Sequence, residues 1–188
     1  MYTKILVSLL LVSTMLLSGC QTTGGERSDS ASAAADIDHE VTQALHSLYQ
    51  SSPEAKALSA RAKGILVFPS VFKAGFIGGG SVGKGALRVG GRTKGYYNTI
   101  SASYGLQAGI QKFGYALFFM DSASLRYLDS SGGWEVGVGP SIVVVDVGVA
   151  RSLTTTTAKE GIYAFIFDQK GLMAGLGLQG SKITKIQP

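Results

Sequence analysis

The sequence predicts an α+β fold in which an N-terminal helical hairpin precedes a strongly curved, glycine-rich, mostly antiparallel, barrel-like β-sheet with one short inserted helix. Three observations support this prediction. Apolar residues recur at helical spacing between residues 36 and 62, the spacing changes to two after Gly64, and 26 of the 188 residues are glycine. Glycine that alternates along strands indicates tight bends and close backbone approach, which favours a curved sheet.

Two consecutive helices are expected before the sheet. The first carries a single apolar stripe, has Asp36 placed to cap its N-terminus and ends near Ser51. The second begins at 52–54, where a serine cap, a proline and a first-turn acid follow one another, and it stops at Gly64. His39 and His46 lie two turns apart on the first helix, a spacing that does not favour a shared metal.

The remainder of the chain is expected to be mostly β-structure. A short strand at 65–68 is closed by Pro69, and residues 78–89 predict a glycine-rich strand pair in which Lys84 and Arg88 share one face. Arg92 and Lys94 are expected on the loop 90–95. Residues 99–111 alternate apolar and polar side chains and predict one long, half-buried strand. Further elements are strands at 115–120, 134–138, 142–149, 162–167 and 172–178, a helix capped at Asp121 and a turn at 130–133.

The glycine cluster Gly78–Gly85 contains the spacings of two nucleotide-binding motifs. However, Gly85 stands where a Ser or Thr must meet magnesium, and no helix follows that could offer its N-terminus to a phosphate. We therefore interpret the cluster as structural and expect no cofactor.

The sequence offers little support for an enzyme. No H-E-x-x-H motif occurs and the only cysteine, Cys20, is expected to be acylated, so we expect no enzymatic activity, with an unrecognised hydrolase as the remaining enzymatic alternative. Asp146 lies inside an apolar run, where a structural role is expected and proton transfer is the alternative.

Residues 1–19 have the organisation of a secretory signal peptide. Lys4 supplies the positive end. The apolar run Ile5–Leu17 is about 13 residues long, which is shorter than a membrane-spanning helix normally requires. The sequence Leu17-Ser18-Gly19-Cys20 resembles a lipobox, whose cysteine receives a diacylglycerol thioether before cleavage. Cys20 is the only cysteine, so no internal disulfide can form. We predict that Cys20 is lipidated, for example with palmitate; a plain secretory signal with a chance cysteine is the alternative.

Three regions follow from this reading of the N-terminus. Residues 1–19 are the signal peptide, residues 20–35 are a lipidated cysteine with a small, polar, flexible tether, and residues 36–188 form a single domain. Gln21 follows the cysteine that we expect to be lipidated. By resemblance to the enterobacterial sorting rule, a residue other than Asp at this position favours the outer membrane. The expected location is therefore the bacterial cell envelope, at the outer membrane facing the periplasm.

Positive charge is concentrated in the first half of the predicted domain. Residues 56–120 contain nine bases and no acid, so they should project a positive field toward anionic partners. The alternative is that these bases are scattered over the domain and only keep it soluble. Nucleic acid fits the charge but not an exported protein, so no nucleic-acid partner is expected.

Three segments resemble the SYLF domain family. Residues 62–85 resemble its opening signature, Ser103–Gly109 resembles its central S-x-G-L-Q-x-G segment, and Lys170–Gly175 resembles its C-terminal turn and strand. The resemblance runs from about 40 to 186. It implies a domain that binds membrane phospholipids through a basic surface, with phosphoinositide binding in eukaryotic relatives and actin binding in some.

These observations predict a non-enzymatic envelope lipoprotein that binds anionic phospholipid through a basic surface. The bases assigned to this surface are Lys63, Lys73, Lys84, Arg88, Arg92 and Lys94. The alternative is a structural or interaction protein of the envelope, which contacts other envelope proteins and uses its lipid only as an anchor.

Overall fold

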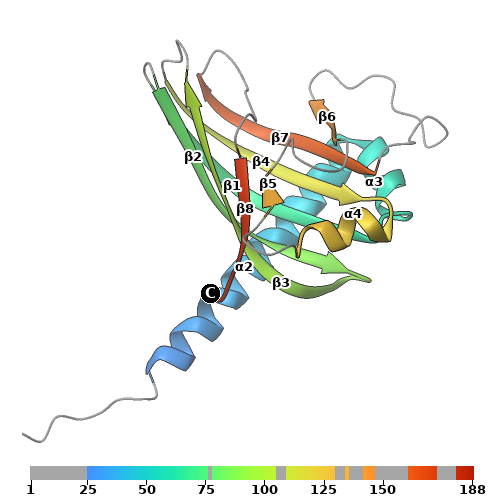
Figure 1. The fold of residues 1–188 in the computed structure, drawn as a ribbon, viewed down its shortest axis with the longest axis horizontal. Coiled ribbons are helices and arrows are strands. Elements are labelled where there is room, and N and C mark those ends of the chain that lie inside the picture. The colour runs from blue at the N-terminus through green and yellow to red at the C-terminus, as the bar shows by residue number, and fades with distance from the viewer. Residues whose placement is uncertain are drawn as a thin grey trace, which may run out of the picture.

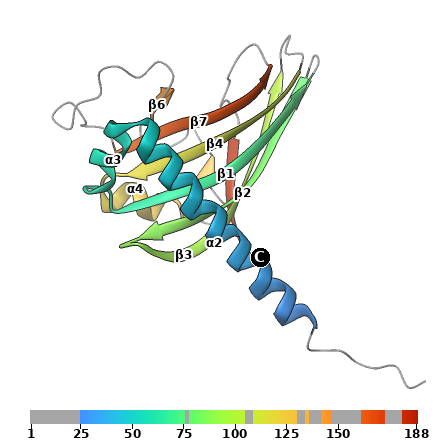
Figure 2. The same cartoon turned by 180° about the vertical axis from the view of Figure 1, so that it is seen from behind.

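The computed structural model describes residues 25–75, 78–104, 109–129, 134–135, 142–146, 161–172 and 181–188. Within these ranges the fold is one twisted sheet with helices on both faces (Figures 1 and 2). Helices α2 (Gly25–Ser51) and α3 (Pro53–Ser59) cover one face, and the short helix α4 (Ser122–Tyr127) lies against the other. The predicted α+β class is confirmed.

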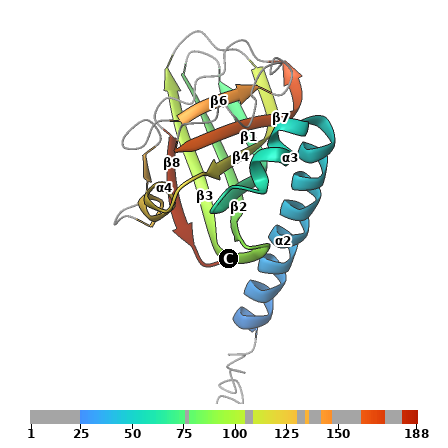
Figure 3. The ribbon, with the colours of Figure 1, turned by 90° about the vertical axis from the view of Figure 1, so that its right-hand side faces the viewer.

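The sheet has eight strands in the order β5-β8-β3-β2-β1-β4-β7-β6. Their bounds are β1 Gly64–Gly75, β2 Gly78–Val89, β3 Arg92–Tyr104, β4 Gly109–Phe119, β5 Trp134–Glu135, β6 Ile142–Asp146, β7 Ile162–Leu172 and β8 Ser181–Ile186. All neighbours pair antiparallel except β6 and β7, which are parallel. The prediction of a barrel-like sheet is only partly met: the sheet is strongly curved, but its strand order is open (Figure 3).

Helix α2 begins at Gly25 and not near Asp36, so it extends through most of the segment expected to be a tether. Its buried contacts begin at Ile37 and continue through Val41, Ala44 and Leu48. The turns before Ile37 project beyond the sheet (Figure 2). They carry no apolar stripe, which explains why the periodicity did not reveal them, but their alanines favour the helical conformation.

Strand β1 does not end at Pro69. Instead the strand continues to Gly75 with a bulge at Pro69, where its register shifts relative to both β2 and β4. A bulge is one of the few places in a sheet that tolerates the missing amide hydrogen of proline. Gly85 on β2 lies against this bulge, and a Cβ there would overlap the carbonyl oxygen of Val67.

The long strand predicted at 99–111 is two strands, β3 and β4, which are separated in the sheet by β2 and β1. The face that is buried is also the opposite of the one expected from the pattern. Thr99, Ser101 and Gln111 are buried, whereas Ile100 and Ile110 are exposed. An alternating pattern shows that two faces differ, but it does not show which face is covered.

Two hydrophobic clusters hold the layers together. On the α2 side, Val41 and Leu48 pack with Val67, Phe118 and Phe165. The other cluster joins strands β1, β3, β4, β7 and β8 to Leu128, which follows α4. Asp121 caps α4 as predicted, because its carboxylate accepts a hydrogen bond from the Ser124 amide at 2.7 Å.

Several predicted features lie outside the described residues. These are the signal peptide 1–19, Cys20, the turn at 130–133 and the ends of three expected strands, at 136–138, 147–149 and 173–178. Asp146 is the last residue of β6, and its role stays a prediction. In the parts of the chain that the structure describes, no helix combines the length and apolar character needed to cross a membrane.

Candidate functional site

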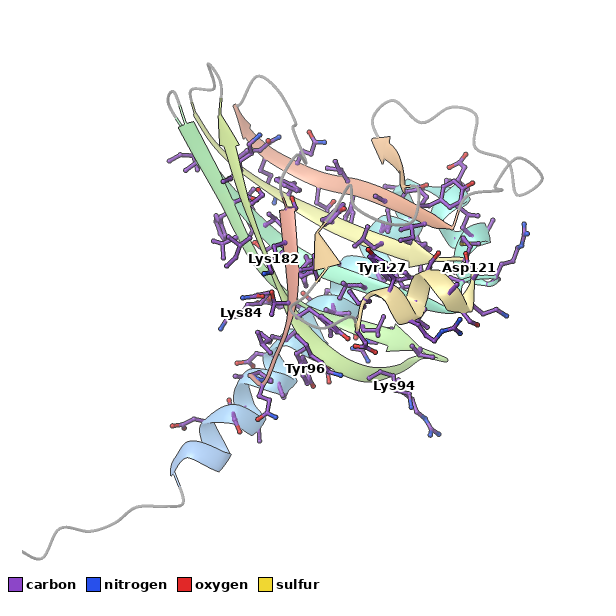
Figure 4. The ribbon with its side chains drawn as sticks, in the orientation of Figure 1. Lys84, Lys94, Tyr96, Asp121, Tyr127 and Lys182 are labelled. Carbon is purple, nitrogen blue, oxygen red and sulfur yellow. The ribbon has the colours of Figure 1, made fainter. Side chains whose placement is uncertain are left out.

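The bases predicted to bind lipid do not form one surface. Lys63, Lys84, Arg92 and Lys94 are exposed, Arg88 is half-buried and Lys73 is buried. Lys84 and Lys94 project from different parts of the domain (Figure 4). The sequence could place these residues in one basic stretch but could not place them on one face.

Lys73 lies on the sheet face opposite α2 and is only 4 % exposed. Its register partners are Ser81 and Gln111, and this face continues through Ser101, whose hydroxyl oxygen lies 2.6 Å from that of Ser81. Burial lowers the pKa of Lys73 because it disfavours the charged form. The assignment of Lys73 to an exposed basic surface is therefore incorrect in this fold.

Arg88 joins the sheet to α2. Its guanidinium lies 3.4 Å from the Asp38 carboxylate and donates to the Asp38 carbonyl at 2.9 Å and to the Thr42 hydroxyl at 3.2 Å. Asp38 also accepts hydrogen bonds from Thr93 at 2.7 Å and Tyr96 at 3.1 Å. Because the positive charge of Arg88 is paired, this side chain holds α2 in place and is poorly suited to an external anion.

Arg92 and Lys94 belong to strand β3 and not to a loop. The turn between β2 and β3 consists of Gly90 and Gly91, whose φ angles are 57° and 78°. Two glycines with positive φ form the tight hairpin turn that matches strand twist, so β3 starts directly after them.

The sheet brings together residues that the sequence did not connect. Consecutive register partners run across β8, β3, β2, β1, β4 and β7, namely Lys182, Ile100, Val82, Phe72, Lys112 and Lys170. Directly paired residues point to the same face of a sheet. Lys84 lies two residues from Val82 and Ile110 two residues from Lys112, so both share this face. We call the set Phe72, Val82, Ile100, Ile110, Lys84, Lys112, Lys170 and Lys182 the lysine-apolar face.

The four apolar members of the lysine-apolar face are well exposed. Phe72 and Val82 are each 53 % exposed, Ile100 is 54 % exposed and Ile110 is 69 % exposed. The ammonium of Lys112 lies 5.3 Å from the centre of the Phe72 ring, within cation–π range. Contiguous exposed apolar side chains with a polar rim are typical of an interaction surface.

A groove of about 900 Å³ separates the C-terminal half of α2 from the lysine-apolar face. Lys84, Lys112 and Lys170 line its sheet side, while Glu40 lines its helix side. Asp168 also lines the groove, and its carboxylate accepts hydrogen bonds of 3.0 and 2.8 Å from the Ser47 hydroxyl. The lysines are therefore concentrated over the sheet and the acids near the helix.

Register partners distinguish the lysines of this face. Lys182 has Glu135 of β5 as a register partner. The register partners of Lys84 are Ser70 and Asn98, and Lys112 pairs with Phe72 and Lys170. Lys84, Lys112 and Lys170 thus have no acidic register partner in the described sheet.

The arrangement offers contact surface and positive charge. The strand pair predicted for this glycine-rich segment is a single strand, because Gly78–Gly85 lies within β2, and it forms no phosphate-binding loop before a helix. Among the described residues, no three His, Cys, Asp or Glu side chains are grouped to hold a metal ion.

The comparisons with known proteins identify the class of domain. Residues 100–187 match the Ysc84 family, which is described as Las17-binding protein actin regulator. The match confirms, over residues 100–187, the resemblance to the SYLF family found in the sequence. Residues 100–187 contain β3 from Ile100 onward, β4, β7 and β8, which carry five of the eight members of the lysine-apolar face. The search of curated proteins gave no match.

Proposed function

We propose that this protein is a non-enzymatic, membrane-anchored lipoprotein of the bacterial cell envelope whose SYLF-type domain binds anionic phospholipid. The observation that carries the proposal is the lysine-apolar face, where Lys84, Lys112 and Lys170 lie beside exposed apolar side chains. A base close to an anionic bilayer contributes about 1 kcal/mol. This proposal revises the site assigned from sequence. It keeps Lys84, excludes Lys73 and Arg88, and adds Lys112 and Lys170.

The remaining exposed bases of the site predicted from sequence, Lys63, Arg92 and Lys94, contribute to the field around the domain. Lys63 lies directly before the start of β1 and the other two follow the β2–β3 turn, away from the exposed apolar side chains of the lysine-apolar face. The field of an exposed charge fades within a Debye length, about 10 Å at 0.1 M salt. We expect these three bases to assist the approach to a membrane more than the bound state.

The anchor in this proposal is Cys20, lipidated after removal of residues 1–19, with the domain on the periplasmic side of the outer membrane. The lipobox-like sequence Leu17-Ser18-Gly19-Cys20 supports this part. The anchor raises the local concentration of the domain near lipid, so the intrinsic affinity of the face need not be high.

A vesicle experiment tests the lipid-binding proposal. A chain of residues 21–188 retains every described helix and strand, because these begin at Gly25. We expect it to co-sediment with vesicles that contain phosphatidylglycerol, to bind more weakly to pure phosphatidylcholine and to lose affinity as salt increases. Equal binding to both vesicles would contradict a role for anionic lipid.

A second candidate is an interaction protein of the envelope in which the lipid serves only as an anchor. The description of the matched family, which names a protein-binding actin regulator, favours this candidate. In that case the exposed apolar side chains of the lysine-apolar face would pack against another protein. The same chain would then fail to co-sediment with either vesicle.

A further inference from the structure

We infer that the lysine-apolar face inserts into the bilayer instead of resting on its surface. Phe72, Val82, Ile100 and Ile110 enter between the lipid headgroups, and Lys84, Lys112 and Lys170 contact the phosphates around them. This inference rests on the proposed function, because it specifies how the same face meets anionic lipid.

The first support is the continuity of the apolar row. Phe72, Val82 and Ile100 are consecutive register partners on β1, β2 and β3. Neighbouring strands lie about 4.8 Å apart, so the row extends roughly 10 Å. Ile110 continues the patch on β4, where it pairs with Ala74. The side chains present a shared ridge that can enter a membrane interface together.

The second support is the reversed burial of β3 and β4. Thr99, Ser101 and Gln111 are 4 %, 7 % and 5 % exposed, whereas Ile100 and Ile110 on the same strands are more than half exposed. Burying polar groups and exposing isoleucine is unfavourable in water. A second environment that covers the isoleucines recovers this lost free energy, and an acyl-chain region is such an environment.

The third support is charge complementarity, which favours a bilayer as the occupant. Lys112 places its ammonium near the edge of the apolar row, over Phe72. Lysine stems that follow apolar side chains toward a charged rim are typical of membrane interfaces, where the ammonium remains among the headgroups. Glu40 and Asp168 lie on the side of the groove next to α2. Anionic lipid repels these two carboxylates and so keeps the α2 side of the groove out of the bilayer. The domain therefore inserts with its sheet and not with α2.

Labelled cysteines test the insertion. The chain 21–188 contains no cysteine, so Val82→Cys and Ile100→Cys each provide one site for an environment-sensitive fluorophore. We expect both labels to shift to the blue when vesicles containing phosphatidylglycerol are added, and brominated acyl chains to quench them. A label at Lys56→Cys, exposed on α3, should change little. Co-sedimentation without a blue shift at 82 and 100 would overturn the insertion but leave the proposed function intact; absence of co-sedimentation would overturn both.

A pair of polar substitutions provides a second, label-free test. Val82→Ser with Ile100→Ser changes two exposed positions, and exposed substitutions usually cost little stability. We expect the parent to retain part of its binding at high salt, where the contribution of the lysines is screened, and the double variant to lose about tenfold or more of that salt-resistant part. Tyr127→Ser, which removes an exposed apolar side chain from α4, is the control and should bind like the parent. Equal salt-resistant binding by the double variant and the parent would contradict insertion.

Discussion

The contacts of Asp38 show how single residues determine which bases remain available to a ligand. Asp38 accepts hydrogen bonds from Thr93 and Tyr96 and pairs with Arg88. We predict that Asp38→Ala lowers the free energy of unfolding by about 1–3 kcal/mol, because these partners lose their acceptor. Urea unfolding measures the effect. Asp36→Ala, at an exposed position of the same helix, is the control, and an equal loss in both variants would refute the role of Asp38.

The cap of α4 has a predicted pH dependence. The hydrogen bond from the Ser124 amide lowers the pKa of Asp121 below its usual 3.8. A depressed folded-state pKa contributes stability above the unfolded pKa, and this stability is lost as the pH falls through the folded value. We predict that Asp121→Ala is less stable by about 1 kcal/mol at neutral pH. Unfolding curves should show a smaller difference in unfolding free energy between the parent and the variant at pH 3 than at pH 7. An equal difference at both pH values would contradict the charged cap.

The predicted processing depends on Cys20. Cys20→Ser removes the thiol that would receive the lipid, and acyl chains supply about 0.8 kcal/mol per buried methylene. We predict that the variant loses palmitate labelling and no longer fractionates with membranes through an acyl anchor. Unchanged labelling would contradict lipidation at this residue.

Individual elements could be predicted where local chemistry determines them. The serine cap with Pro53 marks the start of α3, and Asp121 marks that of α4. The errors concern tertiary context. Pro69 is accommodated by a bulge, the pattern at 99–111 belongs to two strands, and the first helix extends toward Gly25 without an apolar stripe.

The glycines of β2 illustrate a structural constraint on an element. Gly85 has no room for a Cβ because the β1 bulge at Val67 approaches it. We predict that Gly85→Ala costs more than about 2 kcal/mol or prevents folding, since either strand would have to shift. Gly80→Ala places its Cβ 3.3 Å from the Ser101 carbonyl oxygen and should cost clearly less. Circular dichroism melts compare the two variants, and similar losses would contradict the close-approach interpretation.

The whole molecule determines the candidate site. The sequence identified a basic stretch and Lys84, but Lys112, Lys170 and the apolar row are connected only through register across strands that are distant in the chain. Charge balance also concealed Lys170, because the C-terminal part of the chain carries bases and acids in similar number. A surface assembled from several strands requires the topology before its members can be recognised.

The most direct test compares two triple variants of the chain 21–188 that remove equal charge from exposed positions. Lys84→Gln, Lys112→Gln and Lys170→Gln neutralise three lysines of the lysine-apolar face, whereas Lys63→Gln, Arg92→Gln and Lys94→Gln neutralise three exposed bases outside it. At about 1 kcal/mol per base, the first variant should lose roughly two decades of affinity for phosphatidylglycerol vesicles at low salt. The second should lose much less. An equal loss in both folded variants, or a greater loss in the second, would contradict the assignment of lipid binding to this face.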